Sequence, residues 1–300
     1  MLRRNILIFH AGALGDFVLT FPLALGLGRL YPQSRVIYVT HEQKGRLAER
    51  LLGVEWADVE ADWYQLYTDD PRLPPRPVSL LESASTIFSF VCWAGDRWTR
   101  NVGHLAPEAD LRVLQPRPDA SWAGHATDYL LEQLKPLVAV HEAVRQMIRS
   151  IQQRGLCARR AGPVLIHPGS GSDAKCWPVE RFGQLARRLI SAGRPVRFVI
   201  GEVEMERWPV EQVRELAQIA PVSQPRTCLA LHDELLRAGA FVGNDSGPGH
   251  LAGAMGVPSV ILFGPTDPVV WGPLGPCVRA LRADPLTSLD IDQVLAAISE

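Results

Sequence analysis

The sequence lacks the features that define several large classes of protein. No run of apolar residues approaches the roughly 18 needed to span a bilayer, and the N-terminal apolar run at 6–9 is too short for a signal peptide. Lysine and arginine number 31 against 32 acidic residues, so no overall positive charge argues for a nucleic-acid partner. The five scattered cysteines form no CxxC pair, which favours reduced thiols over a disulfide scaffold. We therefore expect a cytoplasmic protein that binds no nucleic acid, and peripheral contact with a membrane surface stays open.

Two common nucleotide-binding fingerprints are missing as well. Neither the dinucleotide pattern G-x-G-x-x-G nor the Walker A pattern GxxxxGK[ST] occurs in the chain. Their absence argues against a plain NAD-dependent dehydrogenase. The chain also has no internal repeat and no low-complexity tract.

What the sequence does contain is an alternation of strand-like and helix-like segments over 300 residues, a length that suggests about two domains. Such alternation is typical of α/β proteins with mostly parallel sheets. The polar, basic stretch 152–162 is the best linker candidate, and it divides the chain into Rossmann-like domains at 1–155 and 163–300. The expected strands are 6–9, 36–39, 86–91, 164–166, 196–200, 241–242 and 260–263, and the expected helices are 16–30, 42–52, 128–134, 138–151, 210–217, 229–238, 251–255 and 291–298.

Other segments carry more specific signals. Between Pro178 and Gly193, apolar residues recur at helical spacing and predict an amphipathic helix that packs on a sheet. The final helix has Asp290 as its N-cap and Gln293 three residues later; packing of this helix back towards the N-terminal domain stays open. Residues 69–77 hold four prolines and should be a loop, whereas 93–118 resists assignment. In the apolar face of the amphipathic helix we include Phe182, Leu185, Ala186, Leu189 and Ile190.

The most informative stretch is GNDSGPGH at 243–250, which runs on to FGPTDP at 263–268. It reads as a strand, a Gly-rich turn, a short helix, a second strand and a second Gly-rich turn. A loop of this kind at the C-terminal end of parallel strands presents backbone N–H groups to an anionic ligand. Asp245 and His250 could add a carboxylate and an imidazole to such a phosphate site, or could merely cap and pack a helix.

A second loop, HPGSGSDAKCWP at 167–178, lies between a strand and the amphipathic helix. Its glycines allow close backbone approach, Ser170 and Ser172 offer hydroxyl donors, and Lys175 offers a point charge. A diphosphate cradle and an ordinary loop with a solvated lysine are equally compatible with this composition.

Carboxylates and aromatic residues supply the remaining candidates. Asp16 ends the GALGD turn after the first strand, where it could cap a helix or act as a base towards a hydroxyl. Glu202 and Glu204 follow the strand at 196–200 and could bind ribose hydroxyls or simply start a solvated helix. Three tryptophans could stack on sugar rings or belong to the core, namely Trp93, Trp98 and Trp122.

Together these residues resemble glycosyltransferase family 9, the ADP-heptose:lipopolysaccharide heptosyltransferases and their relatives. The resemblance has four parts in the same order along the chain: GALGD with LTFPL, HPGSGSDAKCWP with ERF, GNDSGPGHLAGAMGVP, and FGPTDP. The closing helix is similar too. The C-terminal half matches well and the region of about 60–135 matches poorly.

The resemblance implies a GT-B fold, with an acceptor-binding N-terminal domain and a nucleotide-sugar-binding C-terminal domain facing a central cleft. It implies inverting sugar transfer without a metal or other cofactor, from ADP-heptose or a related nucleotide-sugar to a glycan or glycolipid acceptor, at the cytoplasmic face of the inner membrane. Asp16 would be the general base on the acceptor hydroxyl. The implied donor-binding residues are Ser170, Ser172 and Lys175 at the diphosphate, Asp245, Ser246, Gly247 and His250 at the sugar and phosphate end, and Glu202 or Glu204 at the nucleoside.

The implied chemistry agrees with the residues. Glycosyl transfer develops negative charge on the leaving diphosphate, which a preorganised loop with a cation can stabilise without a metal. A carboxylate on the opposite face takes the proton of the nucleophile, which gives inversion.

The chain also departs from the family pattern. His10 stands where family members usually have Lys or Arg, and the chain is short in the acceptor domain. Four arginines could form a basic face for an acidic acceptor or could be merely solvated: Arg97, Arg100, Arg112 and Arg117. Two alternatives stay open: a GT-B enzyme that uses a UDP-sugar or epimerises one at C2, and a non-catalytic homologue that binds a nucleotide-sugar. The presence of Asp16, Lys175, Asp245 and His250 counts against the second.

Overall fold

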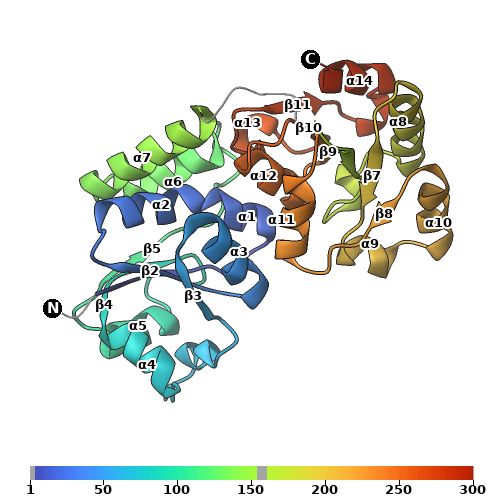
Figure 1. The fold of residues 1–300 in the computed structure, drawn as a ribbon. Helices are drawn as coiled ribbons and strands as arrows, with labels where there is room; N and C mark the ends of the chain where they lie inside the picture. The colour runs from blue at the N-terminus through green and yellow to red at the C-terminus, as the bar shows by residue number, and fades with distance from the viewer. Residues whose placement is uncertain (1–3, 154–160, 300) are drawn as a thin grey trace. The chain divides into compact units, whose positions relative to one another are not determined.

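The structure is a computed structural model, and it describes residues 4–153 and 161–299. The chain forms two compact units (Figure 1). Unit 1 comprises Met1–Trp122 and Ala126–Ile148, and unit 2 comprises Ala123–His125 and Arg149–Glu300. The predicted linker 152–162 lies largely outside the described residues, and the chain changes unit a few residues earlier, within the helix that ends at Gln153.

Unit 1 is built on a five-stranded parallel sheet of order β3-β2-β1-β4-β5. The strands are β1 (Asn5–Phe9), β2 (Arg35–Thr40), β3 (Glu55–Asp58), β4 (Ala84–Ser89) and β5 (Asp110–Val113). The helices are α1 (Leu14–Leu19), α2 (Phe21–Leu30), α3 (Glu42–Leu52), the 3₁₀ helix η1 (Trp63–Tyr67), α4 (Pro75–Glu82), α5 (Arg97–Leu105), α6 (Ala126–Leu134) and α7 (Val138–Gln153).

Side chains of the central strand β1 alternate between the two faces of this sheet, as the period of two in a strand requires. Leu7 and Phe9 join one core with η1, α4 and α5. Phe9 also packs edge-on against Trp98 at 5.0 Å between ring centroids. On the other face, Phe17 of α1 packs on Tyr38 of β2 at 4.8 Å. The carboxyl end of β1 is therefore fixed from both sides.

The helix predicted at 16–30 is two helices in the structure. Thr20 ends α1 and begins α2, and its hydroxyl donates to the Phe17 carbonyl at 2.7 Å and shares a 2.8 Å hydrogen bond with Tyr38. Pro22 follows in the first turn of α2, a position where proline needs no N–H partner. The break separates the short helix that carries Asp16 from the longer one behind it.

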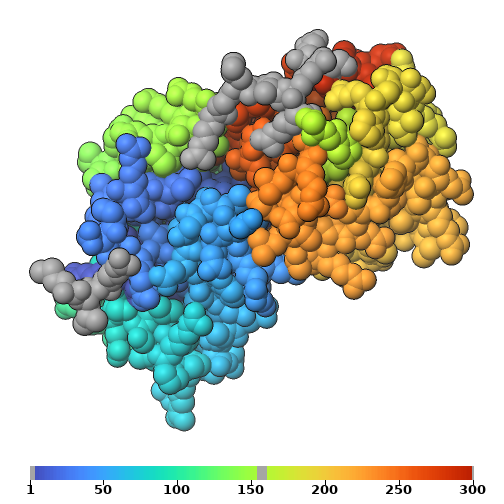
Figure 2. Space-filling view, in the orientation of Figure 1, coloured from blue at the N-terminus to red at the C-terminus, as the bar shows by residue number. Residues whose placement is uncertain are grey.

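The segment that resisted assignment contains regular structure. Residues 93–118 include α5 and β5, and Trp98 on α5 is 1% exposed and belongs to the core. The predicted loop 69–77 is confirmed only as far as Pro74, because α4 begins at Pro75. Proline is well tolerated in a first helical turn, so a proline-rich run can open a helix. The loop before α4 lies on the surface (Figure 2, cyan).

Unit 2 is built on a six-stranded sheet of order β11-β10-β9-β6-β7-β8, again with all pairs parallel. The strands are β6 (Val164–His167), β7 (Val196–Val199), β8 (Val222–Ser223), β9 (Ala240–Asn244), β10 (Ser259–Phe263) and β11 (Val278–Arg282). The helices are η2 (Asp173–Lys175), α8 (Val179–Ser191), α9 (Glu202–Arg207), α10 (Val210–Ile219), α11 (Cys228–Leu236), α12 (Gly247–Ala254), α13 (Pro268–Trp271), η3 (Leu286–Ser288) and α14 (Ile291–Ser299). The expected α/β class with parallel sheets is confirmed.

Two helices of unit 2 differ in detail from the prediction, and the cap predicted for a third is present. On α8 the predicted apolar face is buried except for Ile190, which is 43% exposed at the last turn. Helix α12 begins at Gly247, four residues earlier than predicted, because Pro248 is accommodated in its first turn. Helix α14 has the predicted reciprocal cap between Asp290 and Gln293, and it packs on α8 and β10 within unit 2.

The cysteines differ from one another. Cys92 and Cys176 carry free thiols, as expected, whereas Cys277 is disulfide-bonded. The expectation of reduced thiols is therefore wrong for Cys277, since cysteine spacing along a chain does not show which thiols tertiary structure brings together. Cys157 lies outside the described residues.

Candidate active site

Two loops of unit 2 meet at the carboxyl ends of the neighbouring strands β6 and β9, and Asn244 joins them. The Asn244 amide donates to the Pro168 carbonyl at 2.8 Å, and its oxygen accepts from the Trp177 backbone N–H at 3.0 Å. Asn244 is fully buried, so these hydrogen bonds do not compete with water. Both ends of the 167–178 loop are thereby fixed to the end of β9.

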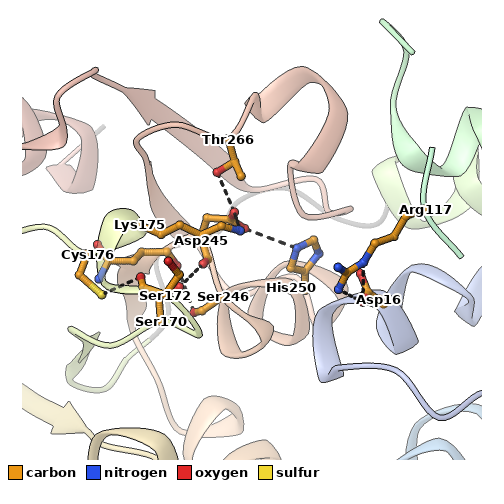
Figure 3. Close-up of polar contacts among 11 residues, drawn as sticks. Asp16, Arg117, Ser170, Ser172, Lys175, Cys176, Asp245, Ser246, His250 and Thr266 are labelled. Carbon is orange, nitrogen blue, oxygen red and sulfur yellow. Dashed lines mark hydrogen bonds and ion pairs between the residues drawn. The ribbon is translucent and has the colours of Figure 1, made fainter. Parts of the chain in front are cut away.

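Lys175 and Asp245 form an ion pair at the centre of these loops (Figure 3). The Lys175 Nζ atom lies 2.8 Å from Asp245 Oδ2, and the Thr266 hydroxyl donates to the same oxygen at 2.8 Å. The Asp245 side chain is 7% exposed, while that of Lys175 remains 32% exposed. Asp245 is therefore held by loops from three strands, and Lys175 keeps an accessible side.

The three predicted serines lie on these loops but have different roles. Ser170 is buried and donates to the Asp245 carbonyl at 2.8 Å, so its hydroxyl joins the two loops. Ser246 precedes α12 as its N-cap residue and donates to the Asn244 carbonyl at 3.1 Å. Ser172 is exposed, whereas Ser246 is only partly so.

Gly247 and His250 lie in the first turn of α12, whose N-terminal end follows β9. The buried His250 has its Nε2 atom 3.9 Å from Asp245 Oδ1 (Figure 3). Gly249 on the same turn packs so closely that a β-carbon would come within 2.9 Å of Ile261. This close approach of α12 to β10 fixes the helix, and its N-terminal N–H groups can bind an anion.

The two glutamates that the sequence could not separate differ clearly in the structure. Glu204 is buried, and its Oε2 atom accepts from the Gly201 N–H at 2.8 Å, so it caps α9. It also lies directly against Gly169, where a β-carbon would overlap its carboxylate. Glu202 is exposed in the first turn of α9. Glu204 thus packs against the 167–178 loop, whereas Glu202 faces solvent.

The 167–178 loop also carries a thiol, that of Cys176. Burial, followed by the charge of Asp173, raises the pKa of the Cys176 thiol to about 11. The thiol therefore stays protonated at neutral pH and is a poor nucleophile.

In unit 1, Asp16 lies in the first turn of α1, after the turn that follows β1. Its side chain is 14% exposed, and Asp16 Oδ2 accepts from Arg117 Nη2 at 2.6 Å and Nε at 3.3 Å (Figure 3). The hydrogen bond and charge of Asp16 raise the pKa of the Arg117 guanidinium. Arg117 follows β5 and its side chain is 63% exposed, so an exposed arginine covers a mostly buried carboxylate.

Beneath this turn lie two buried basic residues. Lys44 Nζ donates to the Gly12 carbonyl at 2.5 Å and the Ala11 carbonyl at 3.4 Å. His10 is 1% exposed, and burial, together with the charge of Lys44, lowers its pKa to about 3. His10 is therefore a neutral imidazole, and the buried positive charge near the GALGD turn belongs to Lys44.

The other predicted basic and aromatic residues do not gather at Asp16. Arg97 pairs with Asp69 at 2.8 Å, Arg112 pairs with Asp110 at 2.8 Å, and Arg100 donates to the Gly95 carbonyl at 2.7 Å. Of the four arginines proposed as a basic face, Arg117 is therefore the one at the candidate base. The tryptophans are equally separate: Trp98 is core, Trp93 is 68% exposed, and Trp122 packs edge-on against Tyr129 at 5.2 Å.

Within residues 4–153 and 161–299 there is no group of three or more His, Cys, Asp or Glu side chains arranged to hold a metal ion. The same part of the chain contains no helix with the length and apolar character needed to cross a membrane.

Residues 118–292 match the family model of glycosyltransferase family 9 (heptosyltransferase). The chain belongs to glycosyltransferase family 9. The match includes every donor-loop residue described above, and it begins one residue after Arg117, so Asp16, Lys44 and His10 lie outside it.

Individual members of the family are similar to this chain over part of their length. Lipopolysaccharide heptosyltransferase 3 of Escherichia coli K12 is 27% identical over 190 residues, which are 59% of this chain and 51% of the relative. Lipopolysaccharide heptosyltransferase 1 of Pseudomonas aeruginosa is 37% identical over 113 residues, 37% of this chain and 31% of the relative. These alignments thus span about half or less of the curated relatives.

Solved structures extend the similarity of fold over nearly the whole chain. The E. coli heptosyltransferase WaaC with ADP has a TM-score of 0.72 at 18% identity, with 98% of this chain and 99% of that chain covered. The E. coli ADP-heptose lipopolysaccharide heptosyltransferase II has a TM-score of 0.70 at 19% identity, with 98% and 97% covered. The predicted GT-B fold of two Rossmann-like units is confirmed.

Three residues of the site were not predicted from the sequence. Asn244 and Thr266 lie inside the predicted Gly-rich motifs. The sequence of such a motif does not show which carboxylate or loop an amide or hydroxyl side chain will bind. Lys44 lies in a helix whose pattern predicts only an amphipathic surface element. A cation at the start of a helix is unfavourable, and this position was the one feature of the sequence that could have pointed to a special role for Lys44.

Proposed function

We propose that the protein is a heptosyltransferase that moves a heptose from ADP-heptose to a hydroxyl of a lipopolysaccharide-core or similar glycan acceptor. Membership of glycosyltransferase family 9 supports the enzyme class. The observation that carries the proposal is the accessible Lys175 ammonium, which Asp245 holds between two Gly-rich loops at the carboxyl edge of a parallel sheet. Such a position suits the diphosphate of a nucleotide-sugar.

In the proposed reaction, the bond between the anomeric carbon and the diphosphate oxygen breaks, and ADP leaves with the bonding electrons. Lys175 and the N–H groups at the start of α12 stabilise the negative charge that develops on the diphosphate. His250 and Asp245 hold the sugar and phosphate end, and Glu202 is placed to accept hydrogen bonds from ribose hydroxyls. These assignments need no metal ion and no cofactor.

Asp16 is the proposed general base. The acceptor oxygen attacks the anomeric carbon from the face opposite the leaving group, and its proton passes to the Asp16 carboxylate, which inverts the configuration. Arg117 occupies Asp16 Oδ2 in the structure, so the acceptor hydroxyl must replace this arginine on at least one oxygen. A glycolipid acceptor would bring the enzyme to the cytoplasmic face of the inner membrane, which we propose as its place of action.

The test is nucleotide binding by isothermal titration calorimetry with ADP, UDP, GDP and NAD, each with and without EDTA. We expect selective binding of ADP that survives EDTA and falls at least tenfold in Lys175→Ala. Lys135→Ala is the matched control, because Lys135 is 60% exposed and pairs only with the neighbouring Glu132. A preference for UDP would assign another donor, and loss of binding in EDTA would contradict the metal-independent mechanism.

Turnover completes the test. Incubation with ADP-heptose and a heptose-deficient lipopolysaccharide core should give a product whose new glycosidic bond has the inverted anomeric configuration by NMR. ADP binding without any turnover on a panel of such acceptors would favour a non-catalytic homologue.

A further inference from the structure

Lys44 occupies a place that is costly for a lysine. It is 9% exposed, although buried ammonium groups are rare unless they are paired. It also lies in the first turn of α3, three residues after the N-cap residue His41. The helix dipole disfavours a cation at that end, so helix stability does not explain Lys44.

What offsets this cost is the turn that leads to Asp16. The Lys44 ammonium donates to the carbonyl oxygens of Ala11 and Gly12 at 3.4 and 2.5 Å. These two residues join the end of β1 to α1. A lysine from the second βα unit thus binds the backbone of the first one.

Gly12 connects these groups to the candidate base. A β-carbon at Gly12 would lie 3.1 Å from the His10 ring and 3.6 Å from Asp16 Oδ2. The carbonyl that Lys44 holds therefore belongs to the residue that separates the imidazole from the carboxylate. A displacement of this carbonyl would move the peptide that lies beside the side chains of His10 and Asp16.

The helix that carries Lys44 is itself fixed. Strand β2 pairs with β1 in parallel register up to Phe9 and Val39, so α3 starts beside the GALGD turn. Gly45, the next residue, packs on Trp56 of β3 so tightly that a β-carbon would lie 2.6 Å from the indole ring. The ammonium of Lys44 is thus delivered from a rigid support, which precise positioning requires.

Lysine is rare in this chain, so a buried lysine at this position needs a specific explanation. Of the 31 basic residues, only Lys44, Lys135 and Lys175 are lysines. Lys175 lies in the donor loop and Lys135 is on the surface. A compact ammonium with three donors can approach two adjacent carbonyls in a buried space where a planar guanidinium does not fit as readily.

We propose that Lys44 is a positioning residue for catalysis: it clamps the Ala11–Gly12 peptide and supplies the buried positive charge that holds the Asp16 carboxylate in its working place. This inference rests on the proposed role of Asp16 as the base. The neutral His10 beside the turn does not supply this charge.

Two variants separate the parts of this role. Lys44→Met removes both the charge and the hydrogen bonds at similar volume, while Lys44→Gln keeps an N–H donor and removes the charge. We expect kcat to fall about 10- to 100-fold in Lys44→Met, since small displacements of a catalytic group have effects of this size. Lys44→Gln should fall less, and the Kd for ADP should stay within twofold in both, because the donor loops belong to the other unit.

A readout other than activity distinguishes positioning from general instability. The charged or titratable groups that act on His10 are Lys44 and His41, and the rings of Phe17 and Phe90 pack around it. Loss of the Lys44 charge should raise the pKa of His10 from its value of about 3, measured by NMR of labelled histidine. Burial is the larger cause, so the pKa should remain below its usual 6.5.

The decisive variant is the double exchange His10→Lys with Lys44→Met, which returns an ammonium to the turn from β1. Recovery of at least half of the lost free energy of activation would support the inference. Lys135→Met should leave kcat unchanged.

An unchanged kcat in Lys44→Met, while Asp16→Asn is inactive, would overturn the inference and leave the proposed function intact. An active Asp16→Asn would overturn the proposed role of Asp16 as the base. If Lys44→Met fails to fold, Lys44→Gln carries the same test, and wild-type kcat and His10 titration in that variant would overturn the role of the charge.

Discussion

In unit 2 the candidate site is held by hydrogen bonds between buried groups, with Asn244, Ser170 and Thr266 joining three loops around Asp245. In unit 1 the candidate base pairs with the exposed Arg117, and the buried Lys44 binds the backbone of the turn before it. The donor loops lie inside the family match, whereas this charged arrangement lies outside it. Under the proposed function, the donor half of the site is therefore preformed by hydrogen bonds within the family-matched loops, and the acceptor half depends on charged side chains outside that match.

The largest effect should come from Asp16→Asn, which keeps the size of the side chain and removes the base. We expect turnover to fall by about 10²- to 10⁴-fold, while ADP binding by calorimetry is unchanged. Asp110→Asn is the matched control, because Asp110 also pairs with one arginine, Arg112, and is about half exposed. Equal activity losses in the two variants would mean that charge alone matters and that Asp16 has no special role.

Asn244→Ala tests the hydrogen bonds that hold the candidate site in unit 2. The change leaves the buried Pro168 carbonyl and Trp177 N–H without their partner, so the free energy of unfolding should fall by about 2 kcal/mol and ADP binding should weaken. Urea denaturation followed by Trp fluorescence and calorimetry measure the two effects. Asn101→Ala provides the control, because Asn101 bridges the Leu66 and Thr68 carbonyls in unit 1; it should destabilise without changing the Kd for ADP.

The buried imidazole gives unit 1 a specific sensitivity to acid. Because the pKa of His10 is lowered from 6.5 to about 3, the unfolded chain binds a proton there that the folded chain does not. Stability from this residue is therefore complete above pH 6.5 and is lost as pH falls towards 3, by at most about 1.4 kcal/mol per pH unit. His10→Leu should flatten the pH dependence of unfolding over this range relative to the wild type, and His104→Leu on the exposed face of α5 should not.

Much of the fold follows from patterns that one sequence displays. A continuous apolar run located β1, period-3.6 apolar spacing located α8, capping residues located α14, and the Gly-rich turns located the donor loops, because these features act locally. Other features depend on partners distant in sequence. Helix α5 in the segment 93–118 was not predicted, because its buried residue Trp98 packs on Phe9, which is distant in sequence. Glu204 is buried and Glu202 is exposed because Glu204 packs against Gly169, and the sequence does not show this contact. The ammonium of Lys44 is the extreme case, since its target is the backbone 32 residues earlier.

The smallest effect should come from Arg117→Ala. Arg117 is 63% exposed, and pairs of this kind contribute less than about 1 kcal/mol to stability, so the melting temperature should hardly change. Since the guanidinium occupies Asp16 Oδ2, its loss should raise kcat/KM a few-fold for an acceptor without acidic groups, because the hydroxyl then has no arginine to displace. Arg112→Ala removes an equivalent two-bond pair with Asp110 and should leave kcat/KM unchanged. A fall in kcat/KM specific to Arg117→Ala would instead make this arginine part of the acceptor site, and the contrast between a preformed donor half and a covered acceptor half would disappear.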